Sequence, residues 1–189
     1  METELELLNS AKQWDKEALA KIFDLYASAI YNYALRLGHD PVLADHIVGD
    51  VFSKLLEQLA FGKGPKHNLR SYLYQTTYHM IVDRGRTLHR SAPLEVADSF
   101  RDEAHSISVS LEDQLMMDII LKSIWNDLTD DQRHVIILRF LEGFNLNETA
   151  AILGKQVSHI KVIQNRAIAK LRKALGDSGA ETGISSNPR

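Results

Sequence analysis

The side chains best suited to bind a polyanion gather near the end of the chain. Residues 155–175 contain six Lys or Arg and no Asp or Glu, although the 189-residue chain has a formal net charge of -3. This stretch follows Gly154 and repeats apolar residues at three- and four-residue spacing, which predicts a helix with one buried side. Cations clustered on the other side of such a helix could neutralise the phosphates of a nucleic acid.

The spacing around Gly154 predicts a helix-turn-helix, in which the small Ala150 lets two helices approach. The buried side of the second helix would comprise Ile160, Ile163, Ala167 and Leu171. Short side chains on the opposite side could read base edges in a major groove while flanking cations hold phosphates. These candidate DNA contacts are Lys155, Ser158, His159, Lys161, Val162, Asn165, Arg166 and Lys170. The alternative is an ordinary helical hairpin whose second helix is basic.

The rest of the composition argues against enzyme and metal chemistry. The chain has no Cys, and its eight His include neither an i, i+4 pair nor an HxH motif. The stretch "FGKGPKH" lacks the Gly-Lys-Ser/Thr ending of a phosphate-binding loop. We therefore expect no catalytic residue, metal or cofactor. The acidic N-terminus and the lack of a run of about 18 apolar residues indicate a cytoplasmic protein without membrane insertion.

The elements that must position these side chains are nearly all helical, which predicts an all-α fold. Two small helical domains, 1–90 and 111–175, would be joined by a flexible acidic linker, 91–110, and followed by a disordered tail, 176–189. Asp40 with Pro41 begins one helix, and capping-box patterns are expected at Thr129 and at Asn145. The expected helices are 15–37, 40–60, 69–89, 111–127, 129–142, 146–153 and 158–175.

A second basic block supports a nucleic-acid partner. Residues 61–90 have a net charge of +5, and residues 91–113 have a net charge of -5. Two cationic modules separated by an acidic segment could meet the same polyanion. Solvated helix faces remain the alternative for either block taken alone.

The C-terminal residues resemble the DNA-binding domain of bacterial RNA polymerase sigma factors. In that family, a polar run and an apolar run precede a Glu-Gly pair and the helix-turn-helix. The matching residues are Leu128, Gln132, Arg133, Leu138, Arg139, Glu142, Gly143, Lys161, Arg166 and Ala167. The stretch "YNYALRLGHDPVLADHIVGDVFSKL" resembles the polymerase-binding helices, and "LRSYLYQTTYHMIVDRGR" resembles the promoter-melting helix. The order and length are similar to the two-domain extracytoplasmic-function class.

This resemblance implies that the chain binds core RNA polymerase and recognises two promoter elements. The helix-turn-helix would contact the -35 element, and the loop after residue 60 with the next helix would contact the -10 element. The expected -10 contacts are Lys63, Lys66, His67, Asn68, Arg70, Tyr74, Tyr78, Arg84 and Arg86. The expected polymerase contacts are Arg36, Ile47, Asp50, Val51 and Phe52. Packing in the domain core is the alternative for the apolar residues, and helix packing is the alternative for the two tyrosines.

Some positions depart from the family pattern, and other functions stay open. His46, Gly49 and His79 replace residues that the family usually has in its polymerase-binding and promoter-melting helices. A stand-alone helix-turn-helix regulator with an N-terminal dimerisation domain is the main alternative, and a helical adaptor without a DNA role is another. Many family members are held by an anti-sigma protein, and the sequence leaves open whether this chain has such a partner.

Overall fold

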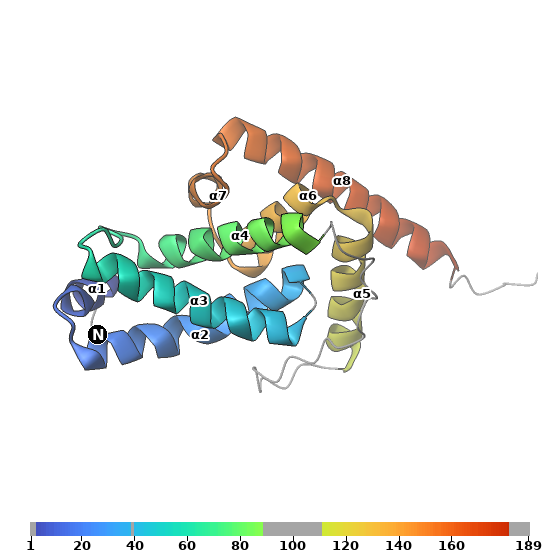
Figure 1. The fold of residues 1–189 in the computed structure, drawn as a ribbon. Helices are drawn as coiled ribbons and strands as arrows, with labels where there is room; N and C mark the ends of the chain where they lie inside the picture. The colour runs from blue at the N-terminus through green and yellow to red at the C-terminus, as the bar shows by residue number, and fades with distance from the viewer. Residues whose placement is uncertain (1–2, 39, 89–110, 182–189) are drawn as a thin grey trace, which may run out of the picture. The chain divides into compact units, whose positions relative to one another are not determined.

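A computed structural model describes residues 3–38, 40–88 and 111–181 (Figure 1). Every regular element in these ranges is a helix, which confirms the predicted all-α class. The described helices divide into two compact units on either side of the predicted linker, except that residues 150–155 group with the first unit. The linker prediction for 91–110 falls outside the described residues, as does most of the predicted tail. No helix among the described residues is long and apolar enough to cross a bilayer.

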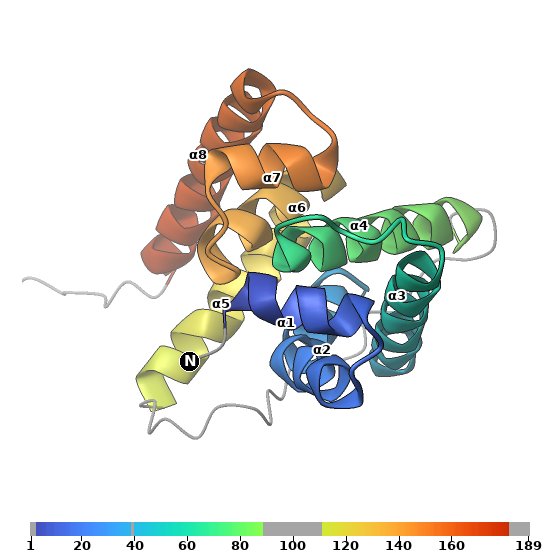
Figure 2. The same cartoon turned by 90° about the vertical axis from the view of Figure 1, so that its left-hand side faces the viewer.

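The first unit contains the helices α1 (Glu4–Lys12), α2 (Lys16–Gly38), α3 (Pro41–Ala60) and α4 (Leu69–Leu88). Helices α2, α3 and α4 pack against one another, and α1 contacts all three. Figures 1 and 2 show α1 at the end of this bundle where α2 and α4 begin. The largest fully buried side chains of the unit are Leu8, Ile22, Ile30, Tyr33, Ile47, Leu55, Leu69, Leu73 and Tyr74.

This core corrects part of the predicted polymerase surface. Ile47 and Val51 have no exposed area, and Phe52 retains 9%. The prediction that Ile47 and Val51 contact polymerase is therefore wrong for the folded unit, and the core alternative is right. The ring of Phe52 lies 4.8 Å from the ring of Phe23, which is 46% exposed. Phe23, which the sequence placed on the apolar face of its helix and not among the polymerase contacts, thus presents the outer part of this aromatic pair to solvent.

Helix α3 begins and ends where its sequence indicates. Asp40 has extended backbone, and its Oδ1 accepts hydrogen bonds from the backbone N–H groups of Val42 and Leu43. At the other end, Gly62 has φ 65°, and the N–H of Lys63 donates to the carbonyl of Gln58 at 2.8 Å. This left-handed turn is the common way to satisfy the last carbonyls of a helix.

Helix α1 is the element that the sequence analysis missed. Thr3 and Glu6 form a reciprocal capping box, in which Glu6 accepts from the N–H of Thr3 at 2.8 Å. This hydrogen bond lowers the pKa of the Glu6 carboxyl. A Thr followed three residues later by Glu is a known helix-start pattern, so the sequence did contain the signal.

The second unit comprises α5 (Leu111–Asp127), α6 (Asp130–Ile136), the π-helical turn η1 (Ile137–Leu141) and α8 (Val157–Glu181). In the chain, α7 (Leu146–Leu153) connects η1 to α8. Helix α8 packs on α5 and α6, and it continues past the predicted end at 175. Its side chains and those of its neighbours bury Ile124, Leu128, Val135, Ile137, Leu138, Phe144, Ile160, Ile163 and Ala167.

Candidate nucleic-acid interface

A glycine turn orients α8 after α7. Gly154 has φ 62°, its N–H donates to the carbonyl of Ala151 at 3.3 Å, and the N–H of Lys155 donates to the carbonyl of Ala150 at 3.0 Å. This pair of bonds is a Schellman motif, whose left-handed position strongly favours glycine. The predicted capping box at the start of α7 is also present, since Asn145 and Glu148 exchange backbone-to-side-chain hydrogen bonds of 2.7 and 3.0 Å.

Replacing Gly154 with Ala should lower the free energy of unfolding by about 1–2 kcal/mol, because an L residue is strained at positive φ. A Cβ at Gly154 meets no atom within 4 Å, so the loss should come from the backbone alone. Gly154→Asn should lose less because Asn tolerates this conformation better. Chemical denaturation of both variants checks the expectation, and equal stabilities for Ala and Gly would contradict it.

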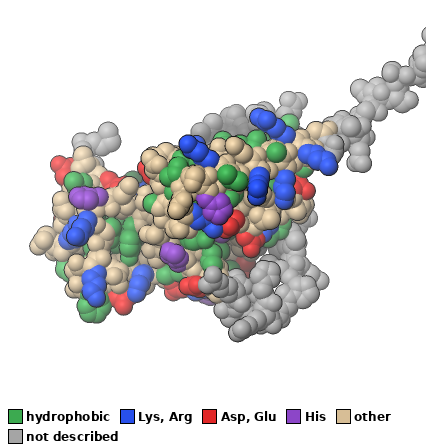
Figure 3. Space-filling model, turned by 90° about the horizontal axis from the view of Figure 1, so that it is seen from above, with side chains coloured by type: hydrophobic (Ala, Val, Ile, Leu, Met, Phe, Trp, Pro, Cys, Tyr) green, Lys and Arg blue, Asp and Glu red, His purple; other side chains and the backbone are tan. Residues whose placement is uncertain are grey.

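Helix α8 has the two faces that the sequence predicts. Ile160 and Ala167 are fully buried, Ile163 is 7% exposed and Leu171 is half-buried. Lys155 is half-buried, and the remaining predicted contacts are exposed: Ser158, His159, Lys161, Val162, Asn165, Arg166 and Lys170. Figure 3 shows separate Lys and Arg side chains spread over the surface seen from above, among hydrophobic and uncharged groups. A mixed row of small polar, apolar and cationic groups on one rigid helix can both read bases and hold phosphates.

Arg139 holds α8 to the rest of its unit. Its Nε donates to Oε1 of Gln164 on α8 at 3.0 Å, and its Nη1 donates to the carbonyl of Phe144. Phe144 is 1% exposed, so the guanidinium fixes a buried loop and the helix together. Arg139 is one of the residues that carry the family resemblance, and here its contacts stabilise the fold that presents α8.

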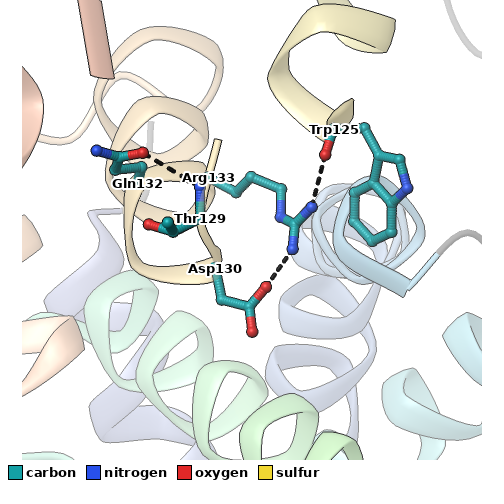
Figure 4. Close-up of polar contacts among 5 residues, drawn as sticks. All are labelled: Trp125, Thr129, Asp130, Gln132 and Arg133. Carbon is teal, nitrogen blue, oxygen red and sulfur yellow. Dashed lines mark hydrogen bonds and ion pairs between the residues drawn. The ribbon is translucent and has the colours of Figure 1, made fainter. Parts of the chain in front are cut away.

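Arg133 makes a similar connection between α5 and α6 (Figure 4). Its Nη1 donates to the carbonyl of Trp125 at 2.7 Å, and its guanidinium lies 4.0 Å from the centre of the Trp125 ring. The other side of the guanidinium pairs with Asp130. At the start of α6, the N–H of Thr129 donates to Oε1 of Gln132 at 3.1 Å, as the predicted capping box requires.

The α3–α4 loop presents the second group of predicted DNA contacts. Lys63, Lys66, His67 and Asn68 are all exposed. Asn68 has φ 60° immediately before α4, so the loop both begins and ends with left-handed backbone. The loop is also tight, because a Cβ on Gly64 would lie 2.7 Å from Cδ2 of Leu59. The exposed polar groups are therefore carried on a loop whose backbone lies close to the end of α3.

The two tyrosines predicted to stack on bases differ in exposure. Tyr74 is fully buried, and its ring lies 5.1 Å from that of Tyr33. The stacking prediction is wrong for Tyr74, because neither face of its ring can reach a base in this fold. Tyr78 is half-buried and lies 5.4 Å from the ring of His79, so it retains some exposed ring surface. Arg70 is also half-buried, with its guanidinium 5.6 Å from the Tyr74 ring.

Two residues assigned to different partners contact each other. Asp50 of α3, a predicted polymerase contact, forms an ion pair with Arg84 of α4, a predicted DNA contact. Their side chains are 52% and 36% exposed, so the pair lies at the surface. Arg36 is half-buried near the end of α2. The side chain of Arg86 lies outside the described residues.

Glu4 is the residue of this region that sequence reasoning missed. Its Oε1 accepts a hydrogen bond of 2.7 Å from the N–H of Leu69, the first residue of α4. Its Oε2 accepts one of 2.8 Å from the hydroxyl of Tyr26 on α2. The first contact spans 65 residues, and no local pattern indicates it.

A basic helix presented after a glycine turn, in a chain whose other helical unit has its own cationic loop, defines a DNA-binding protein of the helix-turn-helix class. Sigma-70 region 2 matches residues 22–91, and Sigma-70, region 4 matches residues 126–173. The chain therefore belongs to the sigma-70 family, and it is an alternative sigma factor that directs RNA polymerase in transcription initiation. This confirms the resemblance, and the match to region 2 does not favour a stand-alone regulator.

Curated relatives agree with this assignment. The chain is 23% identical over 176 residues to the ECF RNA polymerase sigma factor BldN of Streptomyces coelicolor, covering 92% of this chain and 66% of BldN. It is 27% identical over 179 residues to the ECF sigma factor SigK of Mycolicibacterium vanbaalenii, covering 90% and 88%. It is 25% identical over 186 residues to the ECF sigma factor SigW of Bacillus subtilis, covering 90% and 95%.

Solved structures show the same fold. The sigma factor RpoE in complex with the anti-sigma factor NepR from Bartonella quintana has a TM-score of 0.64 and 24% identity, over 83% of this chain and 96% of that one. CnrH in complex with the cytosolic domain of CnrY has a TM-score of 0.66 and 24% identity, over 91% and 96%.

Proposed function

We propose that this sigma factor uses the exposed face of α8 to recognise the upstream promoter element. The observation that carries the proposal is the division of α8 into a buried apolar side and an exposed side of cations and short side chains. Lys161, Arg166 and Lys170 would hold phosphates on either side of a major groove. Ser158, His159, Val162 and Asn165 would face the base edges, where such groups discriminate sequence.

The α3–α4 loop is proposed to meet the downstream element. Lys63 and Lys66 would hold the phosphate backbone, and His67 and Asn68 would hydrogen-bond an extruded base. Tyr78 is the tyrosine left for stacking, since Tyr74 is buried. Stacking of one base contributes about 1–3 kcal/mol, whereas unstacking costs a few kcal/mol per step. The chain alone would therefore not open a duplex, and opening would require the polymerase.

The polymerase would bind the first unit through exposed groups of α2 and α3. Asp50 and the half-buried Arg36 remain candidates, and the exposed ring of Phe23 on α2 offers apolar area next to Phe52 of α3. No catalytic step is proposed for this chain, because the polymerase would carry out the chemistry. The protein would act in the cytoplasm with its polymerase. Since RpoE and CnrH are each described in complex with another protein, an anti-sigma partner is also proposed here.

Reconstitution with purified core polymerase tests the proposal. The chain should associate with the core, and the complex should protect two separate promoter segments and give run-off transcripts from genomic fragments. Protection should weaken steeply as salt increases, because phosphate contacts release counterions. Failure to associate with core at any ionic strength would contradict the proposal. A footprint from the chain without core would instead support the stand-alone regulator.

A further inference from the structure

Glu4 joins three helices of the first unit through one side chain. It is the first residue of α1, and it lies before the segment that matches Sigma-70 region 2, which begins at residue 22. One carboxylate oxygen accepts from the backbone of α4, and the other accepts from the hydroxyl of Tyr26 on α2. Each oxygen is thus committed to a different neighbour, which fixes both the position and the rotation of the carboxylate.

The bond to Leu69 lies where the promoter-reading loop enters α4. The first N–H groups of a helix have no partner within the helix, and a carboxylate there is stabilised by the helix dipole as well as by the hydrogen bond. Asn68, directly before this bond, is in the left-handed region, which is uncommon for a residue other than glycine. The Glu4 carboxylate therefore helps to hold the backbone from which Asn68 and His67 project.

Tyr26 supports the carboxylate from the opposite side. Burial, and then the hydrogen bond to Glu4, raise the pKa of the Tyr26 hydroxyl. The hydroxyl accordingly stays protonated and remains a donor to Glu4 across the working pH range. Leu69 itself has no exposed area, and Pro65 in the loop is also buried. The end of the loop is thus held by the burial of Pro65 and Leu69 and by the hydrogen bond of Glu4 at the start of α4.

We propose that Glu4, supported by Tyr26, is a positioning residue for base recognition by the α3–α4 loop. It acts through the N–H of Leu69 and does not itself touch DNA. Without the carboxylate, the N–H of Leu69 in the first turn of α4 loses its hydrogen-bond acceptor. The backbone that carries His67 and Asn68 toward an extruded base is then held less firmly. This inference rests on the proposed role of the loop at the downstream promoter element.

The test compares Glu4→Ala, Glu4→Gln and Tyr26→Phe in complexes with core polymerase. The readouts are permanganate reactivity of the opened promoter and transcription from templates that carry each single substitution in the downstream element. Glu4→Ala should reduce opening about tenfold and flatten the base preference, because a charge-assisted hydrogen bond is lost. Glu4→Gln keeps an acceptor for Leu69 and should recover much of the preference, and Tyr26→Phe should lie between Glu4→Gln and wild type. Binding to core and upstream protection should not change.

Glu6→Ala is the matched control, since Glu6 lies on the same helix and contacts only the cap at Thr3 among the bonds described. An equal loss of base preference in Glu6→Ala would assign the effect to the stability of α1 and overturn the proposal. Unchanged preference in Glu4→Ala, with wild-type transcription intact, would also overturn it while leaving the proposed function standing. Absence of transcription by the wild-type complex would instead defeat the proposed function.

Discussion

Replacing Lys161 and Arg166 together with Ala should weaken promoter binding by the polymerase complex tenfold or more at low salt. Both side chains are exposed on α8, outside the buried side that contains Ile160. If each holds one phosphate, the slope of log affinity against log salt should become shallower by about two. Titration of a labelled promoter at several salt concentrations measures both quantities.

Two further sets of variants make this result specific. Lys122→Ala removes an exposed cation from α5 and should leave the salt slope unchanged. Changes at Ser158 or His159 should alter which upstream sequences are preferred while changing the salt slope little, since short groups facing bases read sequence and not charge. An unchanged promoter profile and an unchanged slope in all of these variants would refute the assignment of α8 to DNA.

Replacing Arg133 with Met should destabilise the second unit by about 2–3 kcal/mol, because the Trp125 carbonyl loses a charged donor and the indole loses its cation. The Arg133 side chain is only 16% exposed, so water replaces these contacts poorly. Arg133→Lys should recover part of the loss, since Lys restores the charge but not the planar fork. Amide hydrogen exchange in α6 and α8 locates the effect within the unit.

The ion pair with Asp130 should contribute little to that loss. The Asp130 side chain is 73% exposed, and exposed pairs contribute about 0–1 kcal/mol. Asp130→Asn is therefore the matched control and should resemble wild type. If Asp130→Asn were as damaging as Arg133→Met, the exposed pair and not the Trp125 contact would be the source of stability.

The sequence predicted well whatever depends on neighbouring residues. Asp40 with Pro41, Asn145 with Glu148, and Gly154 each mark a helix end within a few residues, and all three are used as expected. The two faces of α8 follow from a repeat of apolar residues along one helix. The predicted DNA face was right in its exposure for the same reason, because a helix that buries Ile160 and Ala167 must turn the opposite side to solvent.

Contacts between distant residues were not predictable in this way. Tyr74 and Tyr78 lie one helical turn apart and look equivalent in sequence, yet Tyr74 is fully buried next to Tyr33 whereas Tyr78 is half-buried. Asp50 and Arg84 are separated by 34 residues, and the sequence predicted them to contact different partners, polymerase and DNA. The hydrogen bond of Glu4 to Leu69 depends on how α1 packs, which local periodicity does not encode.

The two tryptophans of the chain fall in different units. Trp14 lies in the turn after α1 with φ 62° and is 51% exposed, whereas Trp125 lies beneath the Arg133 guanidinium at the end of α5. Intrinsic fluorescence can consequently be assigned without labels once either indole is replaced by Phe. The variant that keeps Trp14 would monitor the first unit, in which Glu4 joins three helices. The variant that keeps Trp125 would monitor the second unit. Comparing the fluorescence unfolding curves of the two variants would then distinguish sequential unfolding of the two units from simultaneous unfolding.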